Sequence, residues 1–550
     1  MSGRTLQVHP QDDVLVALED LPAGAWIEHG NQKLQVLQPI AAKHKLATRD
    51  LAVGDHLKMY GQVVGEVRQA IARGGPVTTG NVVHAIGAVD VPSERFTWQA
   101  PNVDRWRNST FDGFHRADGK VGTGNYWIVI PLVFCQNRNL QMLGDALADE
   151  LGYGRAGRIR HQARWLVDQH RQGTPAERLM GLSWDELPAD EQRRQIFPNV
   201  DGIKLLRHEG GCGCTYEDAI NLCRLFAGYI HNPNVAGATV LSLGCQKSEI
   251  RTLEEELQRL DPQSTKPVYI FDQQKIGTEQ TLVFEAMKHT LAGVALANRQ
   301  QRAPAKLDQL VLGVECGGSD GFSGISANPA MGHTADLLVA LGGTVVLTEF
   351  PELAGCESDL MWRCERPELA ERFLQLMQEY DRRAQLLGGG FHQNPSPGNI
   401  RDGLITDAMK SAGAARKGGT SPVVDVLDYP EVIRRHGLNL LCTPGGDIES
   451  TTAIAGAGGT VQIFSTGLGT PTGNPINPMI KVSTNTPLAQ RMPDIIDLDA
   501  GTIVTGEETI EQVGERLLDL VIEVASGRYV TKAQRLGQDD FMPWRRGMSF

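Results

Sequence analysis

The sequence predicts an α/β multidomain protein, with a small all-β module in front of larger α/β domains. The chain has 550 residues, more than one hydrophobic core usually organises. The first 90 or so residues hold short alternating runs and almost no helical periodicity. From about residue 200, apolar strand-length runs alternate with helical stretches, a pattern typical of a parallel sheet covered by helices.

We expect the β module to occupy residues 1–92. Its alternating runs include residues 6–8, 14–18 and 33–37, and turn signals such as Pro22-Ala23-Gly24 separate them. Residues 93–110 are polar and irregular, which indicates a linker.

A second domain is expected over residues 111–265. It begins with glycine-rich turns and an apolar strand near residues 126–134, and charged, helical sequence near 139–200 reads as an insertion. A C-terminal α/β domain is expected over residues 266–550, with a largely parallel, Rossmann-like sheet.

The candidate chemistry follows the strands. Ligands of open α/β sheets bind beyond the carboxyl ends of the strands. The runs that end in loops rich in Gly, Cys or acidic residues are 202–206, 238–243, 310–314, 344–347, 438–441 and 461–464.

Composition excludes several classes of protein. A formal charge of −12, a pI of about 5.7 and the lack of a Lys/Arg-rich run argue against a nucleic-acid partner. No apolar leader is visible, and no run approaches the ~18 apolar residues that a membrane span needs. The nine cysteines are dispersed and odd in number, so we expect reduced thiols in the cytoplasm.

Several cysteines stand where strands end, and we expect metal ligands among them. Each could instead be a small buried hydrophobe. The candidate ligands are Cys135, Cys212, Cys245 and Cys316.

The loop His208-Glu209-Gly210-Gly211-Cys212-Gly213-Cys214 combines an imidazole, a carboxylate and two thiols. Metal ligation or acid–base work by His208 is the functional interpretation, and a glycine-rich turn with a capping His is the alternative. Cys212 and Cys214 are too close in sequence for the paired cysteines of a structural zinc site.

The loop from Glu315 to Gly324 is the sharpest local signal. Glu315 and Asp320 are candidates for divalent-ion binding or proton transfer. The backbone of Gly317 and Gly318 can approach an anion closely, and the hydroxyls of Ser319 and Ser323 lie beside it. The alternative is a solvated loop. No Gly-Lys-Ser/Thr follows, so it is not a Walker loop.

Later loops offer amides, a cation and hydroxyls, which suit a polyhydroxylated carboxylate. Structural turn chemistry is the alternative for each of them. The candidate substrate-binding residues are Asn394, Asn399, Lys417 and Thr470.

The motifs, in this order, resemble the altronate and galactarate dehydratase family over nearly the whole chain. Lys43-His44-Lys45-Leu46-Ala47 and Lys58-Met59-Tyr60-Gly61 look like the family's SAF-type β-clip module. The remaining similar segments are 113–125, 231–237, 244–245, 315–320, 328–329, 394–399 and 467–473.

The resemblance implies a hydro-lyase that dehydrates a sugar acid to a 2-keto-3-deoxy acid, D-altronate to 2-dehydro-3-deoxy-D-gluconate being the first choice. It brings His44 and Lys45 in as catalytic candidates beside His208, Glu315 and Asp320. The implied cofactor is Fe2+, with Mn2+ or another divalent metal as alternatives. An iron–sulfur cluster on the four candidate thiols stays open, although their spacing matches no compact ferredoxin pattern. We expect a homo-oligomer, with a dimer favoured.

Three alternatives remain: a galactarate dehydratase, a sulfo-lyase on the same scaffold, and a non-catalytic sugar-acid-binding protein. Two departures bear on the substrate. Some altronate dehydratases carry Val-His-x-His-Asn where this chain has Thr78 and Gly80, with His84 nearby as a candidate substitute. Leu468 stands where relatives often have Arg.

Overall fold

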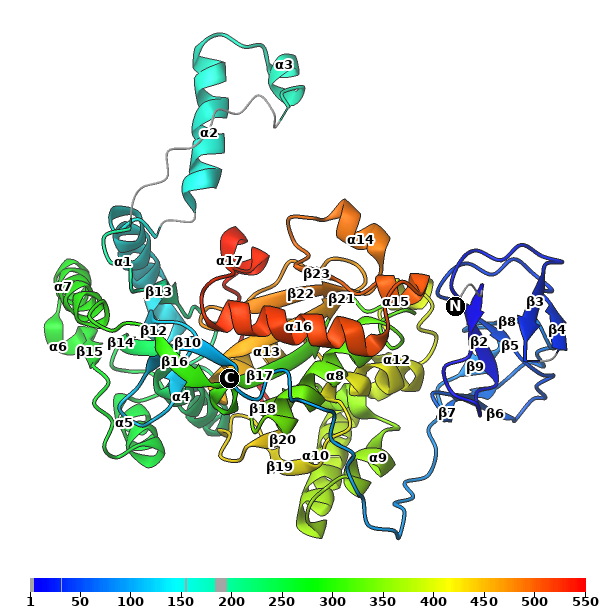
Figure 1. Ribbon diagram of the computed structural model, residues 1–550. Coiled ribbons are helices and arrows are strands. Elements are labelled where there is room, and N and C mark those ends of the chain that lie inside the picture. The colour runs from blue at the N-terminus through cyan, green and yellow to red at the C-terminus, as the bar shows by residue number, and fades with distance from the viewer. Residues whose placement is uncertain (1–3, 31, 154–155, 184–194) are drawn as a thin grey trace.

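The computed structural model describes residues 4–30, 32–153, 156–183 and 195–550. Figure 1 shows a β module at one end, a seven-stranded sheet in the middle, and a four-stranded sheet at the other end, from which a helical arm projects. The described helices include none with the length and apolar character that a membrane crossing requires.

The N-terminal module is built of short antiparallel strands, as the alternating sequence predicts. Strand β6 alternates exposed and buried residues, which is the pattern of a strand with one face on a core. The strands are β1 (Thr5–Leu6), β2 (Val14–Ala17), β3 (Trp26–His29), β4 (Gln32–Gln35), β5 (Lys45–Ala47), β6 (His56–Met59), β7 (Gln62–Val67), β8 (Pro76–Val77) and β9 (Val82–Val83).

The second unit is a parallel sheet in the order β13-β12-β14-β15. Its central strand β12 is apolar and buried along its whole length. The strands are β12 (Tyr126–Pro131), β13 (Gly202–Leu205), β14 (Val235–Ser242) and β15 (Val268–Asp272). The helices are α1 (Asn137–Glu150), α2 (Ala156–Arg171), α3 (Ala176–Met180), α4 (Tyr216–His231), α5 (Ile250–Leu260), α6 (Gln273–Ile276) and α7 (Glu279–Ala297).

The sheet of the second unit continues past the boundary expected after residue 265. β15 pairs with β14, and apolar residues of α7 join the same core. Beyond α7, β16 (Ala303–Lys306) pairs with β10 (Thr110–His115), which also pairs with β11 (Val121–Gly122). Apolar strands of neighbouring domains look alike in sequence, so only the pairing shows which sheet a strand joins.

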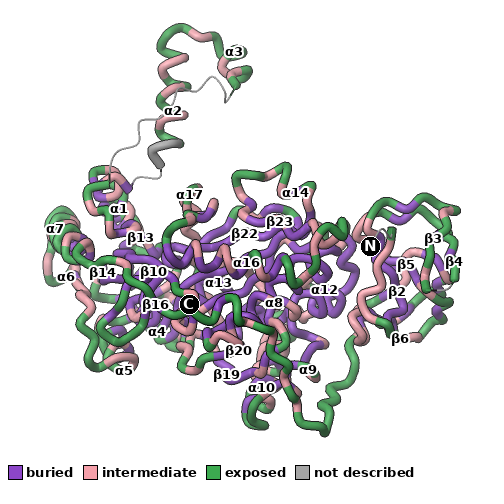
Figure 2. Tube along the Cα trace, in the orientation of Figure 1, coloured by how far each residue is buried: buried purple, intermediate pink, exposed green. Residues whose placement is uncertain are grey.

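Most of the insertion expected near residues 139–200 is helical. Helices α2 and α3 form the exposed arm of Figures 1 and 2, away from the buried sheets. Residues 184–194 of that insertion lie outside the described residues.

The third unit is an all-parallel sheet in the order β19-β20-β18-β17-β21-β22-β23. The chain leaves β17 toward β18 on one side and later returns to β21 on its other side, so the strand order reverses between β17 and β21. Its strands are β17 (Val311–Cys316), β18 (Thr344–Leu347), β19 (Val423–Leu427), β20 (Gly437–Leu441), β21 (Val461–Thr466), β22 (Met479–Ser483) and β23 (Leu498–Asp499).

Helices cover both faces of this sheet. α8 and α16 lie together on one face, while α13 packs with α4 between the two parallel sheets. The helices are α8 (Ala327–Ala340), α9 (Glu357–Trp362), α10 (Pro367–Leu386), α11 (Pro397–Arg401), α12 (Asp407–Ala414), α13 (Asp447–Gly456), α14 (Thr486–Arg491), α15 (Thr502–Thr505), α16 (Ile510–Ala525) and α17 (Lys532–Leu536).

The N-terminal module shares a hydrophobic core with the third unit. Phe322, Ile325 and Met409 join the apolar side chains of β6 and β7 in one buried cluster. The hydroxyl of Thr406 donates to the carbonyl oxygen of Val64 at 2.6 Å. The module is therefore docked beside the carboxyl end of β17.

Candidate active site

A cluster of buried acidic groups and one thiol lies at the carboxyl ends of β17 and β18. Glu315 and Cys316 are the last residues of β17, and Glu349 and Glu352 follow β18. Asp447 joins them from the first turn of α13. This is the place beside the reversal of strand order where open α/β sheets bind ligands.

Two lysines neutralise part of this negative charge. Lys417 Nζ lies 2.5 Å from Glu349 Oε2 and donates to Cys316 Sγ at 3.1 Å. Lys410 Nζ lies 2.5 Å from Glu352 Oε1 and also donates to Asn394 Oδ1 at 2.8 Å. Buried charges of this kind need partners, because water no longer solvates them.

The electrostatics of the cluster favour proton exchange near neutral pH. Burial, aided by the charge of Glu349, raises the pKa of Glu315 well above its usual value. Burial and the charge of Glu352 raise the pKa of Glu349 to about 7, and the same two causes raise that of Asp447 to about 6. Burial lowers the pKa of Lys481 to about 7. Shifted groups gathered in one place are typical of functional sites.

Four buried polar atoms around the cluster have no hydrogen-bond partner among the described contacts. They are Glu315 Oε1, Glu349 Oε1, Ser319 Oγ and Asn394 Nδ2. An unpaired buried polar atom costs about 1–3 kcal/mol, so native proteins rarely keep several together without a ligand. This edge of the sheet thus offers free carboxylate, hydroxyl and amide groups to a polar ligand.

Two overlapping groups in the cluster have the geometry of cation ligands. One joins Glu315, Glu349 and Asp447, and the other joins Cys316, Glu349 and Glu352, each with its ligand atoms within 4.8 Å of one another. The first group suits a divalent cation that prefers oxygen ligands, because Glu315 and Glu349 each have an unpaired carboxylate oxygen.

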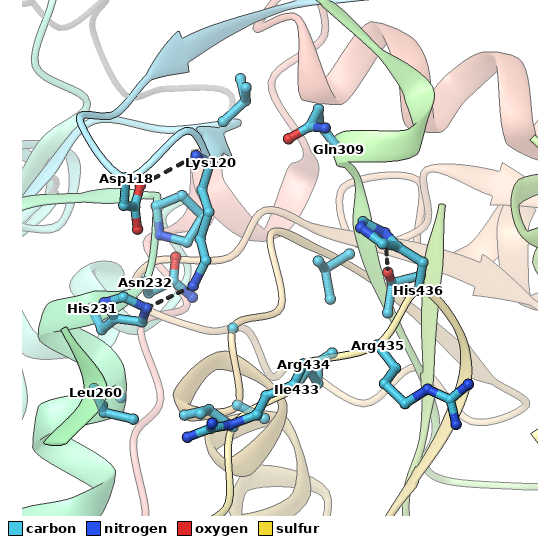
Figure 3. A pocket seen from close by; sticks show the side chains of 18 of the residues that line it. Asp118, Lys120, His231, Asn232, Leu260, Gln309, Ile433, Arg434, Arg435 and His436 are labelled. Atoms are coloured by element: carbon cyan, nitrogen blue, oxygen red, sulfur yellow. Dashed lines mark hydrogen bonds between the residues drawn. The ribbon is translucent and has the colours of Figure 1, made fainter. Parts of the chain in front are cut away.

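A third such group lies at the opposite edge of the sheets. Asp118 and His231 line a cavity of about 480 Å³ near the amino-terminal ends of β17 and β18 (Figure 3), and a carboxylate oxygen of Asp261 lies within 4.8 Å of their ligand atoms. There Lys120 Nζ lies 2.6 Å from His231 Nε2. Because the ammonium already engages the imidazole lone pair, this group is a poorer metal site.

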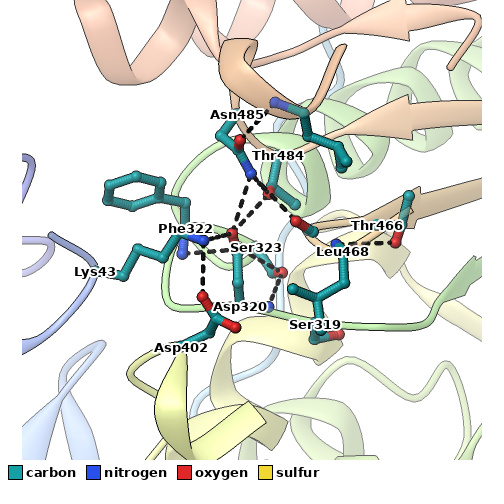
Figure 4. Close-up of polar contacts among 12 residues, drawn as sticks. Lys43, Ser319, Asp320, Phe322, Ser323, Asp402, Thr466, Leu468, Thr484 and Asn485 are labelled. Carbon is teal, nitrogen blue, oxygen red and sulfur yellow. Dashed lines mark hydrogen bonds and ion pairs between the residues drawn. The ribbon is translucent and has the colours of Figure 1, made fainter. Parts of the chain in front are cut away.

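Asp320 links the loop after β17 to the N-terminal module. Its buried carboxylate accepts hydrogen bonds from the hydroxyls of Ser323 and Thr484 and from the amide of Asn485. Lys43 of the module reaches it with an Nζ–Oδ2 distance of 3.0 Å (Figure 4). The module thus places a cation on the glycine-rich loop.

His44 and Lys45 make backbone contacts with the third unit. His44 Nε2 is 3.0 Å from the carbonyl oxygen of Arg401. Lys45 is fully buried and donates to the carbonyl oxygen of Gly403 at 2.6 Å, and burial lowers its pKa to about 7. Of this motif, Lys43 is the residue that forms the ion pair with Asp320.

The candidate substrate-binding residues converge on the same edge. Asn399 caps α11 with Ser396 and donates to the carbonyl oxygen of Ser319 at 2.7 Å. A Cβ on Gly318 would lie 2.7 Å from Thr470 Oγ1, so these two loops also touch. Other contacts connect the remaining members, Gly317, Ser323, Asn394 and Lys417, to the cluster.

His208 and three of the four candidate thiols lie elsewhere. His208 is buried, with Nε2 2.6 Å from Pro131 O and Nδ1 accepting from Gly210 N, so both ring nitrogens are engaged by backbone. Burial lowers its pKa to about 4. Cys135, Cys212 and Cys245 are exposed at the second sheet, whereas Cys316 is buried at the third unit's sheet. No group of three or more described ligand atoms within 4.8 Å of one another holds two of these four thiols.

Sequence reasoning overlooked several members of the cluster. Glu349 and Glu352 follow the apolar run 344–347, and Asp447 follows the run 438–441, so their positions after strands were an available signal. Lys410 lies inside a helix, where no local pattern marks it.

Comparisons with known proteins cover the whole architecture. Residues 3–85 match the altronate/galactarate dehydratase SAF domain, residues 113–298 match the second domain of D-galactarate dehydratase/altronate hydrolase, and residues 307–549 match the C-terminal domain of D-galactarate/altronate dehydratase.

Three relatives match over most of their own length and most of this chain. The chain is 32% identical to an altronate dehydratase of Bacillus subtilis, over 96% of this chain and 95% of the relative. It is 32% identical to an altronate dehydratase of Escherichia coli, over 95% of each chain. It is also 32% identical to a galactarate dehydratase (L-threo-forming) of Escherichia coli, over 97% of this chain and 94% of the relative.

Proposed function

We propose a function from the premise that the chain belongs to the D-galactarate/altronate dehydratase family and is a hydro-lyase. Its substrate is a sugar acid, and we assign D-altronate, which is dehydrated to 2-dehydro-3-deoxy-D-gluconate. The observation that carries this proposal is the set of unpaired, buried polar atoms among the acidic residues at the end of β17.

Dehydration of an α,β-dihydroxy acid needs a base for the α-proton and an acid for the departing hydroxyl. Both groups work best with pKa values near the working pH. We assign the base to Asp447, which is partly exposed and has a pKa of about 6, and the acid to Lys481, with a pKa of about 7. The two charges interact, since each shifts the pKa of the other.

The carboxylate of the substrate would be received by the loop at Gly317 and Gly318. The absence of a side chain lets Asp447 approach, because a Cβ on Gly317 would lie 2.1 Å from Asp447 Oδ2. The unpaired atoms of Ser319 and Asn394 would form hydrogen bonds with hydroxyl groups of the substrate.

The resident metal we propose is Fe2+, or another divalent cation in its place. Glu315 and Glu349 would hold it through their unpaired oxygens. A bound divalent cation stabilises the negative charge that develops on the substrate carboxylate when the α-proton leaves.

The glycine-rich loop of residues 467–473 carries no positive charge. This favours a hexonate, which has one carboxylate, over a hexarate, which has two. Leu468 is 38% exposed and lies beside Gly318, where a Cβ would be 3.3 Å from Leu468 Cβ. An apolar side chain here offers no cation to a second carboxylate.

The test is an anaerobic assay of the Fe2+-loaded protein on D-altronate, galactarate and sulfolactate, with detection of 2-keto acids and of sulfite. We expect a 2-keto-3-deoxy acid from D-altronate, and a fall in kcat of at least about 10²-fold in Asp447→Asn and Lys481→Met. Asp145→Asn, an exchange at an exposed carboxylate of α1, serves as the matched control. If neither D-altronate nor galactarate yields a keto acid, the proposal is wrong.

A further inference from the structure

Three cysteines of this chain are exposed, which packing does not explain. Cys135, Cys212 and Cys245 are exposed, whereas the remaining six cysteines are buried or partly buried. Free cysteine is ordinarily among the most buried residue types, because it packs as a small hydrophobe.

The three thiols follow three adjacent strands. Cys135 comes after β12, Cys212 lies in the loop after β13, and Cys245 follows β14. These strands are parallel neighbours in the order β13-β12-β14, so their carboxyl ends share one edge. Neighbouring strands lie about 4.8 Å apart, which puts the three loops within roughly 10 Å.

Backbone contacts join the three loops into one surface. Phe134 N donates to Gly210 O at 3.1 Å, and Lys247 N donates to Gly211 O at 2.9 Å. Gly211 has a φ of +95°, and a Cβ there would lie 2.2 Å from Leu132 O and 2.8 Å from Ser248 Oγ. The glycine before Cys212 therefore allows the close approach of all three loops.

The three sulfurs do not all lie within 4.8 Å of one another, so they are too far apart to share a single ion. In a tetrahedral site with metal–sulfur bonds of about 2.3 Å, thiolates lie roughly 3.8 Å apart. The three sulfurs are absent from the described groups whose ligand atoms all lie within 4.8 Å. A cubane of irons and sulfides occupies the centre of its ligands and holds the thiolates farther apart.

We propose that Cys135, Cys212 and Cys245 bind one iron–sulfur cluster of the [4Fe–4S] type. Each of the three thiolates would bind one iron. The fourth iron would remain open to an oxygen ligand. This site is separate from the carboxylates of Glu315 and Glu349.

The place of the cluster suggests what the open iron meets. A cavity of about 610 Å³ is lined by His208, Gly210 and Gly211, next to Cys212, and from the other side by Glu449 of α13 and Asp540. The cavity thus lies between the end of β13 with the loop after it, the first turn of α13 and the C-terminal segment 539–545. The oxygen ligand is then a hydroxy acid of the kind that the proposed function, on which this last step rests, assigns as substrate. Its hydroxyl or carboxylate oxygen would bind as a Lewis base, without electron transfer.

The test measures the cluster without turnover. The full chain is purified anaerobically, reconstituted with Fe2+ and sulfide, desalted, and analysed for iron, acid-labile sulfide, visible absorption and electron paramagnetic resonance after reduction. We expect about four irons and four sulfides per chain. Cys135→Ser, Cys212→Ser and Cys245→Ser should each lose most of the sulfide, and Cys364→Ser, at a partly buried thiol outside this edge, should keep it.

Other outcomes overturn the proposal. These are iron without sulfide, full sulfide content in the triple serine variant, equal loss in Cys364→Ser, or a disulfide between two of the three cysteines in place of a cluster. Circular dichroism of each variant separates loss of the cluster from loss of the fold. Sulfide content is measured without substrate, so this test is independent of the activity assay. The cluster can be absent while D-altronate is still dehydrated, and it can be present while D-altronate is not dehydrated.

Discussion

Glu315 and Glu349 illustrate how single residues of this protein are held in a costly state. Each is fully buried and leaves one carboxylate oxygen without a partner, although Lys417 neutralises part of the charge. Glu349 also has a φ of 63°, which side-chain-bearing residues rarely adopt. Strain and unpaired polarity at the same residue are typical of sites kept for a ligand.

A substitution at Gly317 tests whether activity requires the close approach of Asp447 to this glycine. Gly317→Ala places a methyl group 2.1 Å from Asp447 Oδ2 and 2.5 Å from the ring of Phe464, so Asp447 must move. We expect kcat/KM to fall by about 10²-fold, since a shift of ~1 Å in a catalytic group costs that much. Steady-state kinetics and the melting temperature are the measurements.

The control for this prediction is Gly181→Ala, in the exposed helical arm. Its added Cβ would meet nothing closer than 3.6 Å. Unchanged kinetics in both variants would contradict the role given to Gly317.

Leu468 tests the preference for one carboxylate over two. Leu468→Arg brings a guanidinium to an exposed position beside Gly318, where it can pair with a second carboxylate. We expect the ratio of kcat/KM for galactarate to that for D-altronate to rise by about tenfold or more, which is about 1.4 kcal/mol. Leu468→Met is the apolar control, and an unchanged ratio in the arginine variant argues against this position as a determinant.

At the scale of elements, the strands were easier to predict than the residues that helices bring to the site. The runs 344–347, 438–441 and 461–464 lie in strands, and the run 310–314 does so from Val311 onward, because an unbroken apolar run suits a strand buried on both faces. Lys410 and Lys417 come from α12 and the turn after it. Nothing in a local pattern shows that a helix will carry its lysines to a distant strand end.

Helix α12 begins with a carboxyl group whose titration should be visible in stability. Burial, with the charge of Glu352, raises the pKa of Asp407 to about 8. Between about pH 4 and pH 8 the folded protein then keeps a proton that the unfolded chain has lost, so stability falls as pH rises.

Asp407→Asn should remove this dependence, because the amide resembles the protonated acid and does not titrate. We compare the unfolding free energies of the variant and the parent protein at each pH. The value for the variant minus the value for the parent protein should be about 2 kcal/mol larger at pH 8 than at pH 6. Urea denaturation at the two pH values measures the difference. Parallel pH profiles of the two proteins would contradict the assignment.

At the scale of the whole molecule, docking of the N-terminal module completes the site. Lys43 is the module's cation on Asp320, and the side chains of the pair are 19% and 0% exposed. Apolar contacts at Phe322 and Met409 hold the same surfaces together. The module therefore contributes both to docking and to the charge of the glycine-rich loop.

Lys43→Met should weaken this docking while both parts stay folded. It leaves Asp320 buried without its ion pair, which we expect to cost about 1–3 kcal/mol, less than a fully buried pair because Lys43 is partly exposed. Limited proteolysis in residues 93–110 should become faster, and dehydration slower. Lys33→Met, at an exposed strand residue of the module, is the control. Equal proteolysis in both variants would rule out the role of Lys43.

The sequence by itself determined the class of fold, the family and the loops that carry the chemistry. Parallel strands need apolar runs, and their carboxyl ends must share an edge, so the loop from Glu315 to Ser323 could be identified from its pattern. Only the tertiary structure decided which groups meet. It placed Glu349 and Lys417 together, assigned β15 to the second sheet, and separated Cys316 from the three exposed thiols. The physical reason is that strand order and the docking of helices are set by long-range packing, which short sequence patterns do not encode.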